Sequence, residues 1–299
     1  MVYASTIKFL IKNGDFNKIL KSMKFYLVDK SKRKNLQYNE KQLIINGCKM
    51  KLLPNDEGIS SELLIHGIHE PLTTHLVNEE IRSGMKIIDI GSNIGYYAIL
   101  ESRLVGKSGK IFSIEPSPTN FELLKENLEL QNEKNFELYN LAIGDKNEEI
   151  EFLISKKSNW SKIKGKTDIV GENEVIKVSS KTLDEFCEQN KIENIDLIRM
   201  DVEGYEFNII NGAEKILKKF KPIIMIEIHK MYLGKVKTKK IFEELKRLDF
   251  ELKYYYPRIF DTPIIAEKKD IKKLSIDELM EKLNQDKLPE AFQITAISK

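Results

Sequence analysis

From about residue 70 onward, short apolar runs alternate with amphipathic stretches of helical period. The apolar runs are typical of buried strands, and the stretches between them repeat apolar residues at three- and four-residue spacing. In chain order they are KIIDIG, a helix over 95–105, KIFSIE, a helix over 119–131, FELYNLAI, IDLIRMD, a helix over 205–219, PIIMIEIH, a helix over 237–248 and FELKYYY. This alternation predicts an α/β fold with a doubly wound, mostly parallel sheet that helices cover on both faces.

Two segments depart from the alternation. The first comes before it: residues 5–30 mix apolar and lysine positions at helical spacing, which predicts two short helices, and QLIINGCKMKLL predicts a β-hairpin that turns at Asn46-Gly47. The second is 146–182, where EEIEFLIS and VIKVSS alternate apolar and polar residues like an antiparallel pair. The polar loop between them holds the only tryptophan, Trp160, which would either cover an acceptor or lie on a surface loop.

Composition narrows the class of protein. The chain has 299 residues and is 41% hydrophobic, which is enough to bury a large core. No apolar run reaches about 18 residues, and charged residues interrupt the first 16 positions, so we expect neither a spanning helix nor a secretory signal but a cytoplasmic protein. Cys48 and Cys187 lack any CxxC context, which argues against a disulfide framework or a thiolate metal site.

Charge is distributed unevenly along the chain. The formal net charge is +3, but residues 1–35 hold nine Lys or Arg against two Asp, which gives +7 there and leaves −4 for the remainder. A basic N-terminal segment could contact an anionic membrane surface or a nucleic acid. A solvated lysine face in a lysine-rich protein is the ordinary alternative.

The run Gly91-Ser92-Asn93-Ile94-Gly95 follows the first apolar strand and precedes a helix. A dinucleotide site needs GxGxxG, in which the middle glycine lets a pyrophosphate approach the backbone. Asn93 stands at that middle position, so NAD and FAD are disfavoured. The triplet Gly106-Lys107-Ser108 lacks the first glycine of a phosphate loop and lies between a helix and a strand, which predicts a simple turn.

A nucleoside without phosphates fits the strand ends better. Asp89 begins the run DxGxNxG at the carboxyl end of the first strand, where open α/β sheets bind ligands. Glu115, followed by Pro116, ends the next strand 26 positions later and could accept hydrogen bonds from both ribose hydroxyls. Ala142 and Ile143, at the end of the third strand, suit an adenine edge. Each feature alone has a structural explanation, but together they indicate S-adenosylmethionine, with contacts from Asp89, Gly91, Ser92, Asn93, Gly95, Tyr96, Glu115, Pro116, Ala142, Ile143 and Asp201.

Four polar residues follow two other strands. IDLIRM leads to Asp201 and Glu203, and PIIMIEIH carries Glu227 and His229 two residues apart, hence on one side. A hydroxyl needs help to lose its proton before methyl transfer, so we predict His229 as the general base, because imidazole titrates near neutrality. Asp201 and Glu203 would orient the acceptor or stabilise the cationic cofactor.

Two groups of residues could be metal ligands. Asp201, Glu203 and Glu227 would offer hard oxygen ligands to Mg²⁺, but nothing in their spacing requires an ion, so no metal ligand is assigned. His66, His69 and His75 lack the fourth ligand of a structural zinc site. Of Tyr96 and Tyr97, one could lie along the methionine part of the cofactor, although core packing explains the pair nearly as well.

Taken in order, DIGSNIG, IEPSPTNFELLKENL, NLAIGD, TLDEF, IDLIRMDVEGYE, NGAEKIL and KPIIMIEIH resemble the FkbM family of class I methyltransferases, over about residues 70–250. The resemblance implies a Rossmann-like, seven-stranded sheet, S-adenosylmethionine as cofactor and O-methylation of a sugar or another hydroxyl. Glu70, in a Glu-Pro pair before the first strand, resembles an acidic residue of the family that could seat the cofactor's amino group.

The resulting organisation is a basic helical and hairpin extension over 1–65, a methyltransferase domain over 66–270 with a hairpin insertion at 146–182, and a C-terminal helical extension over 271–299. The predicted acceptor is a small molecule or a glycan, above all a sugar of a glycan or glycolipid, with peripheral membrane contact through the basic N-terminus. RNA methylation is the alternative, although no NPPY-type motif or basic aromatic platform supports a nucleic-acid partner. A non-catalytic module that binds the nucleoside is a third hypothesis.

Overall fold

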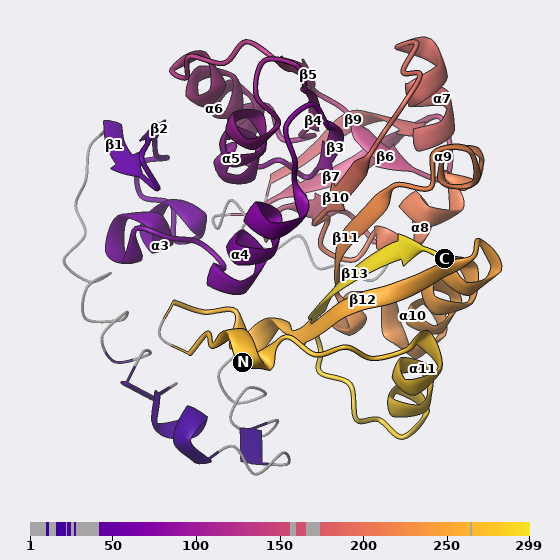
Figure 1. The fold of residues 1–299 in the computed structure, drawn as a ribbon. Helices are drawn as coiled ribbons and strands as arrows, with labels where there is room; N and C mark the ends of the chain where they lie inside the picture. Colours follow the sequence, from indigo (N-terminus) through magenta and orange to yellow (C-terminus); the bar gives the residue numbers. More distant parts are fainter. Residues whose placement is uncertain are drawn as a thin grey trace.

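The computed structural model describes residues 10–11, 16–21, 23–24, 27, 42–155, 160–165, 174–263 and 265–299. Its centre is a seven-stranded sheet with the order β12-β13-β11-β10-β3-β4-β5 (Figure 1). The strands are β3 (Lys86–Ile90), β4 (Lys110–Ile114), β5 (Phe136–Tyr139), β10 (Leu197–Met200), β11 (Ile223–Ile228), β12 (Phe250–Pro257) and β13 (Phe292–Ser298). β5, β4, β3, β10 and β11 pair in parallel, and β13 runs antiparallel to β11 and β12. The predicted seven-stranded, mostly parallel α/β fold is confirmed.

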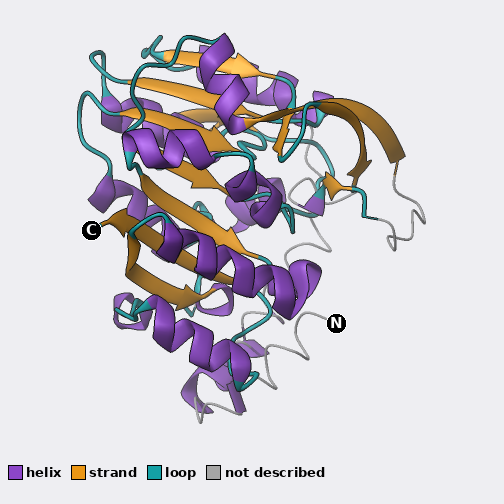
Figure 2. Ribbon diagram, turned by 90° about the vertical axis from the view of Figure 1, so that its right-hand side faces the viewer, coloured by secondary structure: helices purple, strands orange, loops and turns teal. Residues whose placement is uncertain are grey.

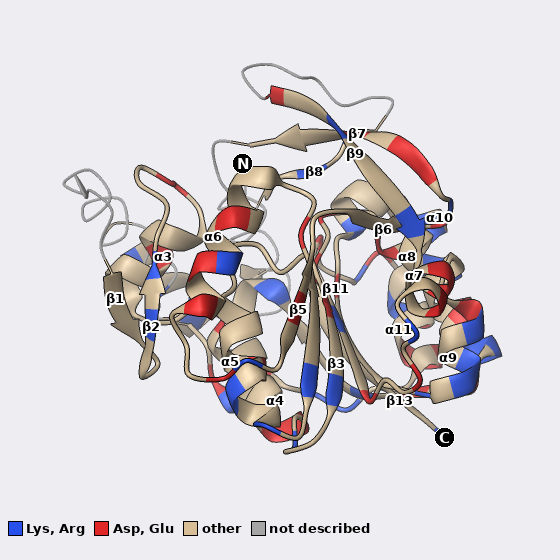
Figure 3. Cartoon of the chain, turned by 90° about the horizontal axis from the view of Figure 1, so that it is seen from above, with Lys and Arg blue, Asp and Glu red and all other residues tan. Residues whose placement is uncertain are grey.

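Helices cover both faces of this sheet (Figure 2). One core cluster joins the sheet to α3 (Ile59–His66), α4 (Pro71–Glu80), α5 (Tyr96–Val105) and α6 (Pro118–Glu129). The other joins it to α7 (Leu183–Gln189), α8 (Glu206–Asn211), α9 (Glu214–Phe220), α10 (Lys230–Arg247) and α11 (Ile276–Asn284). Figure 3 shows that the charged residues lie mainly on the outer helices, whereas the central strands are largely uncharged.

The period of two along each strand decides which side chains meet which helices. In β3, Ile87 belongs to the cluster under α4 and α5, and Ile88 belongs to the opposite cluster. Asp89 therefore points to the α5 side. Arg199 is its direct partner in the register of β10 and points to the same side. One charged pair is thus buried between the sheet and α5.

A second, four-stranded sheet has the order β6-β9-β7-β8, with β6 (Ala142–Gly144), β7 (Glu148–Ile154), β8 (Lys162–Ile163) and β9 (Glu174–Thr182). β7 and β9 form the antiparallel pair that the sequence predicts. The prediction that FELYNLAI is one strand is wrong, since β5 and β6 belong to different sheets. The chain changes sheet between Tyr139 and Ala142, so the end of β5 and the insertion lie next to each other.

The end of the chain also differs from the prediction. A purely helical segment over 271–299 is wrong: α11 is followed by β13, which lies inside the sheet between β11 and β12. Thr295 and Gln293 are buried polar residues in β13 that break its apolar alternation, which hid the strand. The division of the chain into three parts stays a prediction.

Two predicted helices have different bounds. The helix expected over 205–219 is two helices, α8 and α9, with a break at Gly212-Ala213. The helix expected over 237–248 already begins at Lys230 and is kinked at Gly234, where φ is 68°. Two short 3-10 turns, Arg258–Phe260 and Lys268–Asp270, follow β12.

The N-terminal hairpin is confirmed. β1 (Gln42–Ile45) and β2 (Cys48–Lys51) pair around Asn46 and Gly47, whose φ angles of 50° and 76° are those of a two-residue primed turn. Of the two helices predicted over 5–30, residues 10–11, 16–21, 23–24 and 27 are helical, and the others lie outside the described residues. None of the described helices is long and apolar enough to cross a bilayer. Both cysteines are free and buried.

Gly91 is the tightest point in the loop after β3. Its φ is 84°, and a Cβ there would lie 2.1 Å from the Asp201 carbonyl oxygen at the end of β10. Gly67 has a similar φ of 70°, but a Cβ at that position would meet only open space. We expect Gly91→Ala to lower the free energy of unfolding by about 3 kcal/mol and Gly67→Ala by about 1 kcal/mol, because only the first adds a steric clash to left-handed strain. Urea unfolding followed by circular dichroism measures both, and equal losses would contradict the close approach.

Candidate active site

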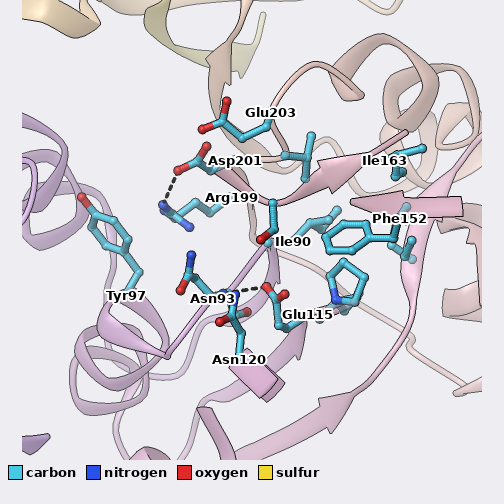
Figure 4. A pocket seen from close by; sticks show the side chains of 18 of the residues that line it. Ile90, Asn93, Tyr97, Glu115, Asn120, Phe152, Ile163, Arg199, Asp201 and Glu203 are labelled. Atoms are coloured by element: carbon cyan, nitrogen blue, oxygen red, sulfur yellow. Dashed lines mark hydrogen bonds and ion pairs between the residues drawn. The ribbon is translucent and has the colours of Figure 1, made fainter. Parts of the chain in front are cut away.

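A pocket opens at the carboxyl ends of β3, β4 and β10. Its lining comes from the ends of these strands, from the loops that follow them and from the insertion (Figure 4). Nine of the predicted cofactor residues line it: Gly91, Ser92, Asn93, Tyr96, Glu115, Pro116, Ala142, Ile143 and Asp201. Three do not line it: Glu70, Asp89 and Gly95.

The glycine loop forms the floor of the pocket. Asn93 adopts a φ of 50°, a left-handed conformation that asparagine tolerates better than most residues, and its Oδ1 accepts a hydrogen bond from the Ile94 amide at 2.8 Å. Its side-chain amide points toward the pocket (Figure 4). Gly95 begins α5 with a φ of 91°, and a Cβ there would lie 2.9 Å from Leu124 Cδ1. Gly95 thus serves the packing of α5 on α6.

Hydrogen bonds hold the Glu115 carboxyl in one orientation at the pocket. Its Oε2 accepts a hydrogen bond from the Asn93 amide and its Oε1 from the Ser117 amide, both at 2.9 Å. Burial raises the pKa of this carboxyl to about 7. The two backbone donors and the Asn120 side chain fix the orientation of the carboxylate beside the pocket.

An apolar wall lies beyond Glu115. It combines Ile114, Pro116 and Ile143 with two residues of the insertion, Phe152 and Ile163. Such a wall suits the flat face of a purine base. The sequence did not single out Phe152 or Ile163, because an apolar residue in a predicted hairpin looks like ordinary core.

Trp160 is 43% exposed and does not line the pocket, whereas its neighbour Ser161 does. Its role as a cover for the acceptor stays a prediction.

The inner end of the pocket is built around Arg199. Its Nη1 donates to Asp89 Oδ1 at 2.8 Å, its Nη2 lies 3.5 Å from Asp201 Oδ2, and its guanidinium carbon lies 3.8 Å from the centre of the Tyr97 ring. Asp89 is fully buried and holds Arg199 instead of facing the pocket. Arg199 and Tyr97 both line the pocket. The sequence signal that could have found Arg199 is a single charge in an otherwise apolar strand.

Asp201, Glu203, Glu227 and His229 come together as predicted. His229 Nε2 lies 3.2 Å from Glu227 Oε1 and 3.4 Å from Glu203 Oε2, and its Nδ1 lies 2.6 Å from Glu206 Oε1. Burial alone would lower the pKa of this imidazole, but the surrounding carboxylates raise it well above its usual value. The three surrounding carboxylates therefore favour the protonated imidazole, and this moves the titration of His229 above the neutral range that the sequence suggested.

Two of the four face the pocket. Asp201 and Glu203 line it, while Glu227 and His229 lie behind them and are almost fully buried. Burial raises the pKa of Asp201 to about 7 and that of Glu203 to about 8. Glu203 has a φ of 49° and Gly204 a φ of 98°. Strained left-handed residues of this kind cluster at functional sites.

Asp201, Glu227 and His229 are also the one set of potential metal ligands that the described residues bring together. Each offers an atom, and these atoms lie within 4.8 Å of one another. His229 is oriented through its other nitrogen by Glu206, the arrangement in which a histidine commonly binds a metal.

A second histidine, His69, is held in a similar way. Its Nδ1 lies 3.0 Å from Glu62 Oε2 and its Nε2 lies 3.1 Å from Glu70 Oε1. Although burial opposes it, these two carboxylates raise the pKa of His69 to about 10. His69 lines the pocket, so the motif HGIHEP contributes to the site without an obvious zinc geometry.

Glu70 lies one contact away from the pocket. It has a φ of 43°, accepts a hydrogen bond from the Tyr97 hydroxyl at 2.9 Å, and lies 2.6 Å from Arg258 Nη2. Arg258 Nε lies 3.2 Å from Glu227 Oε1, so this arginine connects Glu70 to Glu227 behind the pocket. The sequence gives no signal for Arg258, because it follows β12 far from every motif.

Carboxyl groups outnumber cationic side chains in this network. It holds four cations, His69, Arg199, His229 and Arg258, and seven carboxylates, Glu62, Glu70, Asp89, Asp201, Glu203, Glu206 and Glu227. Buried carboxylates without cationic partners are costly, so the site favours a cationic ligand. The sulfonium and ammonium groups of S-adenosylmethionine carry the kind of charge that would meet this requirement.

The known proteins that this chain resembles in sequence are methyltransferases. The sequence model of the methyltransferase FkbM domain matches residues 89–252, and that of protein-L-isoaspartate(D-aspartate) O-methyltransferase matches 18–148. The 2-O-methyltransferase NoeI of Sinorhizobium fredii is 28% identical over 211 residues, which cover 64% of this chain and 85% of NoeI. The hexuronic acid methyltransferase AglP of Haloferax volcanii is 26% identical over 162 residues, which cover 52% of this chain and 60% of AglP.

Among solved structures, the methyltransferase FkbM from Methylobacillus flagellatus KT has a TM-score of 0.44 and 14% identity, over 74% of this chain and 50% of that one. The FkbM sequence model covers more than half of the chain, from Asp89 of the first strand to Leu252 of β12. The chain belongs to the FkbM family of S-adenosylmethionine-dependent methyltransferases.

Proposed function

We propose that this enzyme transfers a methyl group from S-adenosylmethionine to a hydroxyl group of a sugar. The observation that carries the proposal is the pair of carboxylates, Asp201 and Glu203, that face the pocket in front of a buried His229. A carboxylate in that place can bind a hydroxyl and remove its proton. The names of two relatives support this choice of acceptor. NoeI is named a 2-O-methyltransferase, which is consistent with transfer to a hydroxyl oxygen, and AglP is named a hexuronic acid methyltransferase, which is consistent with a sugar.

Different residues of the pocket would bind different parts of the cofactor. Glu115 would accept hydrogen bonds from the ribose hydroxyls, the apolar wall with Ile143 and Phe152 would hold the adenine, and Asp201 with Arg199 would bind the amino-acid end. The cofactor supplies an electrophilic methyl carbon. Except for Phe152, which lies within β7 of the insertion, the groups that would hold it come from a strand end or from the loop that follows one. The positions of the strands therefore decide where the methyl would lie.

Glu203 is the general base in this proposal. It faces the pocket, and its Oε2 contacts the Nε2 of His229, which is itself held by Glu206. The hydroxyl oxygen forms a bond to the methyl carbon, the carbon–sulfur bond breaks with its electron pair left on sulfur, and the hydroxyl proton passes to Glu203. His229 orients Glu203 and stabilises its negative charge, which is a different role from the base that the sequence suggested.

Glu203→Gln tests this assignment. We expect kcat to fall about 100-fold or more, because general-base assistance is lost, while the dissociation constant of S-adenosylhomocysteine changes little. The assay follows radiolabelled methyl from S-adenosylmethionine into fractionated cell glycans, glycolipids and RNA. Glu149→Gln is the matched control, since Glu149 is an exposed glutamate of β7, far from the pocket lining.

Three outcomes of that assay would count against the proposal. Label in RNA alone would replace the sugar by a nucleic acid as acceptor. No label in any fraction, together with a normal rise in melting temperature on adding S-adenosylhomocysteine, would favour a binding module. A Glu203→Gln enzyme with unchanged kcat would remove Glu203 from the role of base.

The pKa of Glu115 predicts a pH dependence that adenosine can isolate. Adenosine carries the ribose and the base but no sulfonium or amino group, so Asp201 and Glu203 should not affect its binding. Because the pKa of Glu115 is raised to about 7, its hydroxyl-binding carboxylate form is scarce at pH 6 and dominant at pH 8. We expect adenosine affinity, measured by calorimetry, to rise about tenfold over that interval.

Two variants check the source of this rise. Glu115→Gln should bind adenosine more weakly and show no rise, because an amide does not ionise. Asp201→Asn should keep the rise of the unmodified protein. A pH profile that Glu115→Gln leaves unchanged would contradict the placement of the ribose.

A divalent cation is the second cofactor that we include in the proposal. The supporting observation is the set Asp201, Glu227 and His229, with ligand atoms within 4.8 Å of one another. Carboxylate ligands alone would suit Mg²⁺, but the imidazole of His229 favours a softer ion such as Mn²⁺. Bound there, the ion would take the place of the proton on Nε2 of His229, because an imidazolium has no lone pair for a metal, and it would hold the acceptor oxygen beside Glu203.

Mn²⁺ titration of the EDTA-treated protein, followed by electron paramagnetic resonance of the free ion, tests the site. We expect one ion per chain, with binding weakened more than about tenfold by His229→Gln or Asp201→Asn. His75→Gln is the control, because His75 lies on α4 outside this set. Absence of binding, or binding that His229→Gln leaves intact, would exclude the cation from the proposal.

A further inference from the structure

The N-terminal helical segment, here the described residues 16–21, 23–24 and 27, exposes a row of large apolar side chains. Phe16, Leu20, Met23 and Leu27 are 69%, 69%, 50% and 65% exposed. They are spaced by four, three and four residues, so they lie on one face of a helix. We call these four residues the apolar row. Single exposed apolar residues need no explanation, but a continuous row of four does.

The opposite face of the segment is attached to the protein. Lys18 is 7% exposed, forms an ion pair with Asp270 and lies 3.6 Å from the centre of the Phe260 ring. Lys21 pairs with Glu267 at 2.7 Å, and Ile19 packs against the core cluster beneath α4 and α5. These contacts fix the rotation of the helical segment (Figure 1, indigo), and the exposed fractions of the apolar row place it on the outward side.

Charge identifies the kind of surface that would cover the row. Residues 1–35 carry +7, whereas the remainder of the chain carries −4. An anionic surface would therefore attract this segment and repel the remainder of the molecule. Two copies that met through this segment would repel each other, because each carries +7 there. RNA offers the negative charge but no apolar layer for four large side chains.

We propose that the apolar row docks this enzyme on an anionic lipid bilayer. The row enters the boundary between head groups and acyl chains, and the net positive charge of residues 1–35 attracts the anionic head groups. The combination of apolar insertion and basic charge gives two weak signals on one surface, which is what stable yet reversible attachment requires.

The docking bears on the substrate without depending on it. An enzyme held at a bilayer meets acceptors that are themselves anchored there, so a lipid-linked sugar would be concentrated at the same surface. This consequence rests on the proposed function, whereas the docking itself rests only on the apolar row, its attachment and the charge. The two ideas therefore fail separately.

Flotation of the purified full-length chain with lipid vesicles tests the docking. We expect the protein to float with vesicles of phosphatidylglycerol and phosphatidylcholine, to float much less with phosphatidylcholine alone, and to be released by high salt. Phe16→Ser combined with Leu20→Ser should lower the bound fraction at least about fivefold, because half of the apolar row is lost. Ile44→Ser is the matched control, since Ile44 is 68% exposed on β1, outside the row.

The outcomes separate the alternatives. No flotation with anionic vesicles, or an equal loss in Ile44→Ser and in the double variant, would overturn the proposal. Salt-sensitive retention of RNA in place of vesicles would assign the segment to a nucleic acid. The rise in melting temperature with S-adenosylhomocysteine, measured on the same samples, reports the methyltransferase site and should be the same in every variant.

Discussion

The excess of buried carboxylates over cations at the carboxyl ends of β10 and β11 is the constraint on which the site depends. Seven carboxylates share His69, Arg199, His229 and Arg258, and burial raises the pKa of two of them, Asp201 and Glu203. A polar interior of this kind is costly until a positive ligand enters. In the proposed function, the sulfonium of the cofactor would supply that positive charge beside Asp201 and Glu203.

The fold places these charges by simple rules. Parallel strands bring their carboxyl ends to one edge, so Asp201 after β10 and Glu227 in β11 become neighbours although they are distant in sequence. The period of two along β3 and β10 sends Asp89 and Arg199 to the α5 side, where Tyr97 covers the guanidinium. Gly91 lets the loop after β3 approach the end of β10. The pocket is thus a consequence of strand order and register.

The sequence predicted the parts of the molecule that depend on local pattern. The strand–helix alternation gave most of the sheet, and the spacing from the glycine run to Glu115 gave the pocket floor, because strand ends and turns have local signals. It missed β13, whose buried Thr295 and Gln293 break the apolar pattern. It also missed Arg258 and Phe152, which reach the site only through long-range contacts. The sequence placed His229 beside Glu203 and Glu227, but it did not predict the raised pKa of the imidazole. That pKa depends on neighbouring charges that the sequence does not reveal.

A crystal structure of the chain with S-adenosylhomocysteine tests the central claim most directly. The account predicts the ribose hydroxyls on Glu115, the adenine between Ile143 and Phe152, and the sulfur atom beside Asp201 and Glu203, with His229 still enclosed by its carboxylates. A ligand bound elsewhere, or one whose sulfur lies far from those two carboxylates, would contradict it.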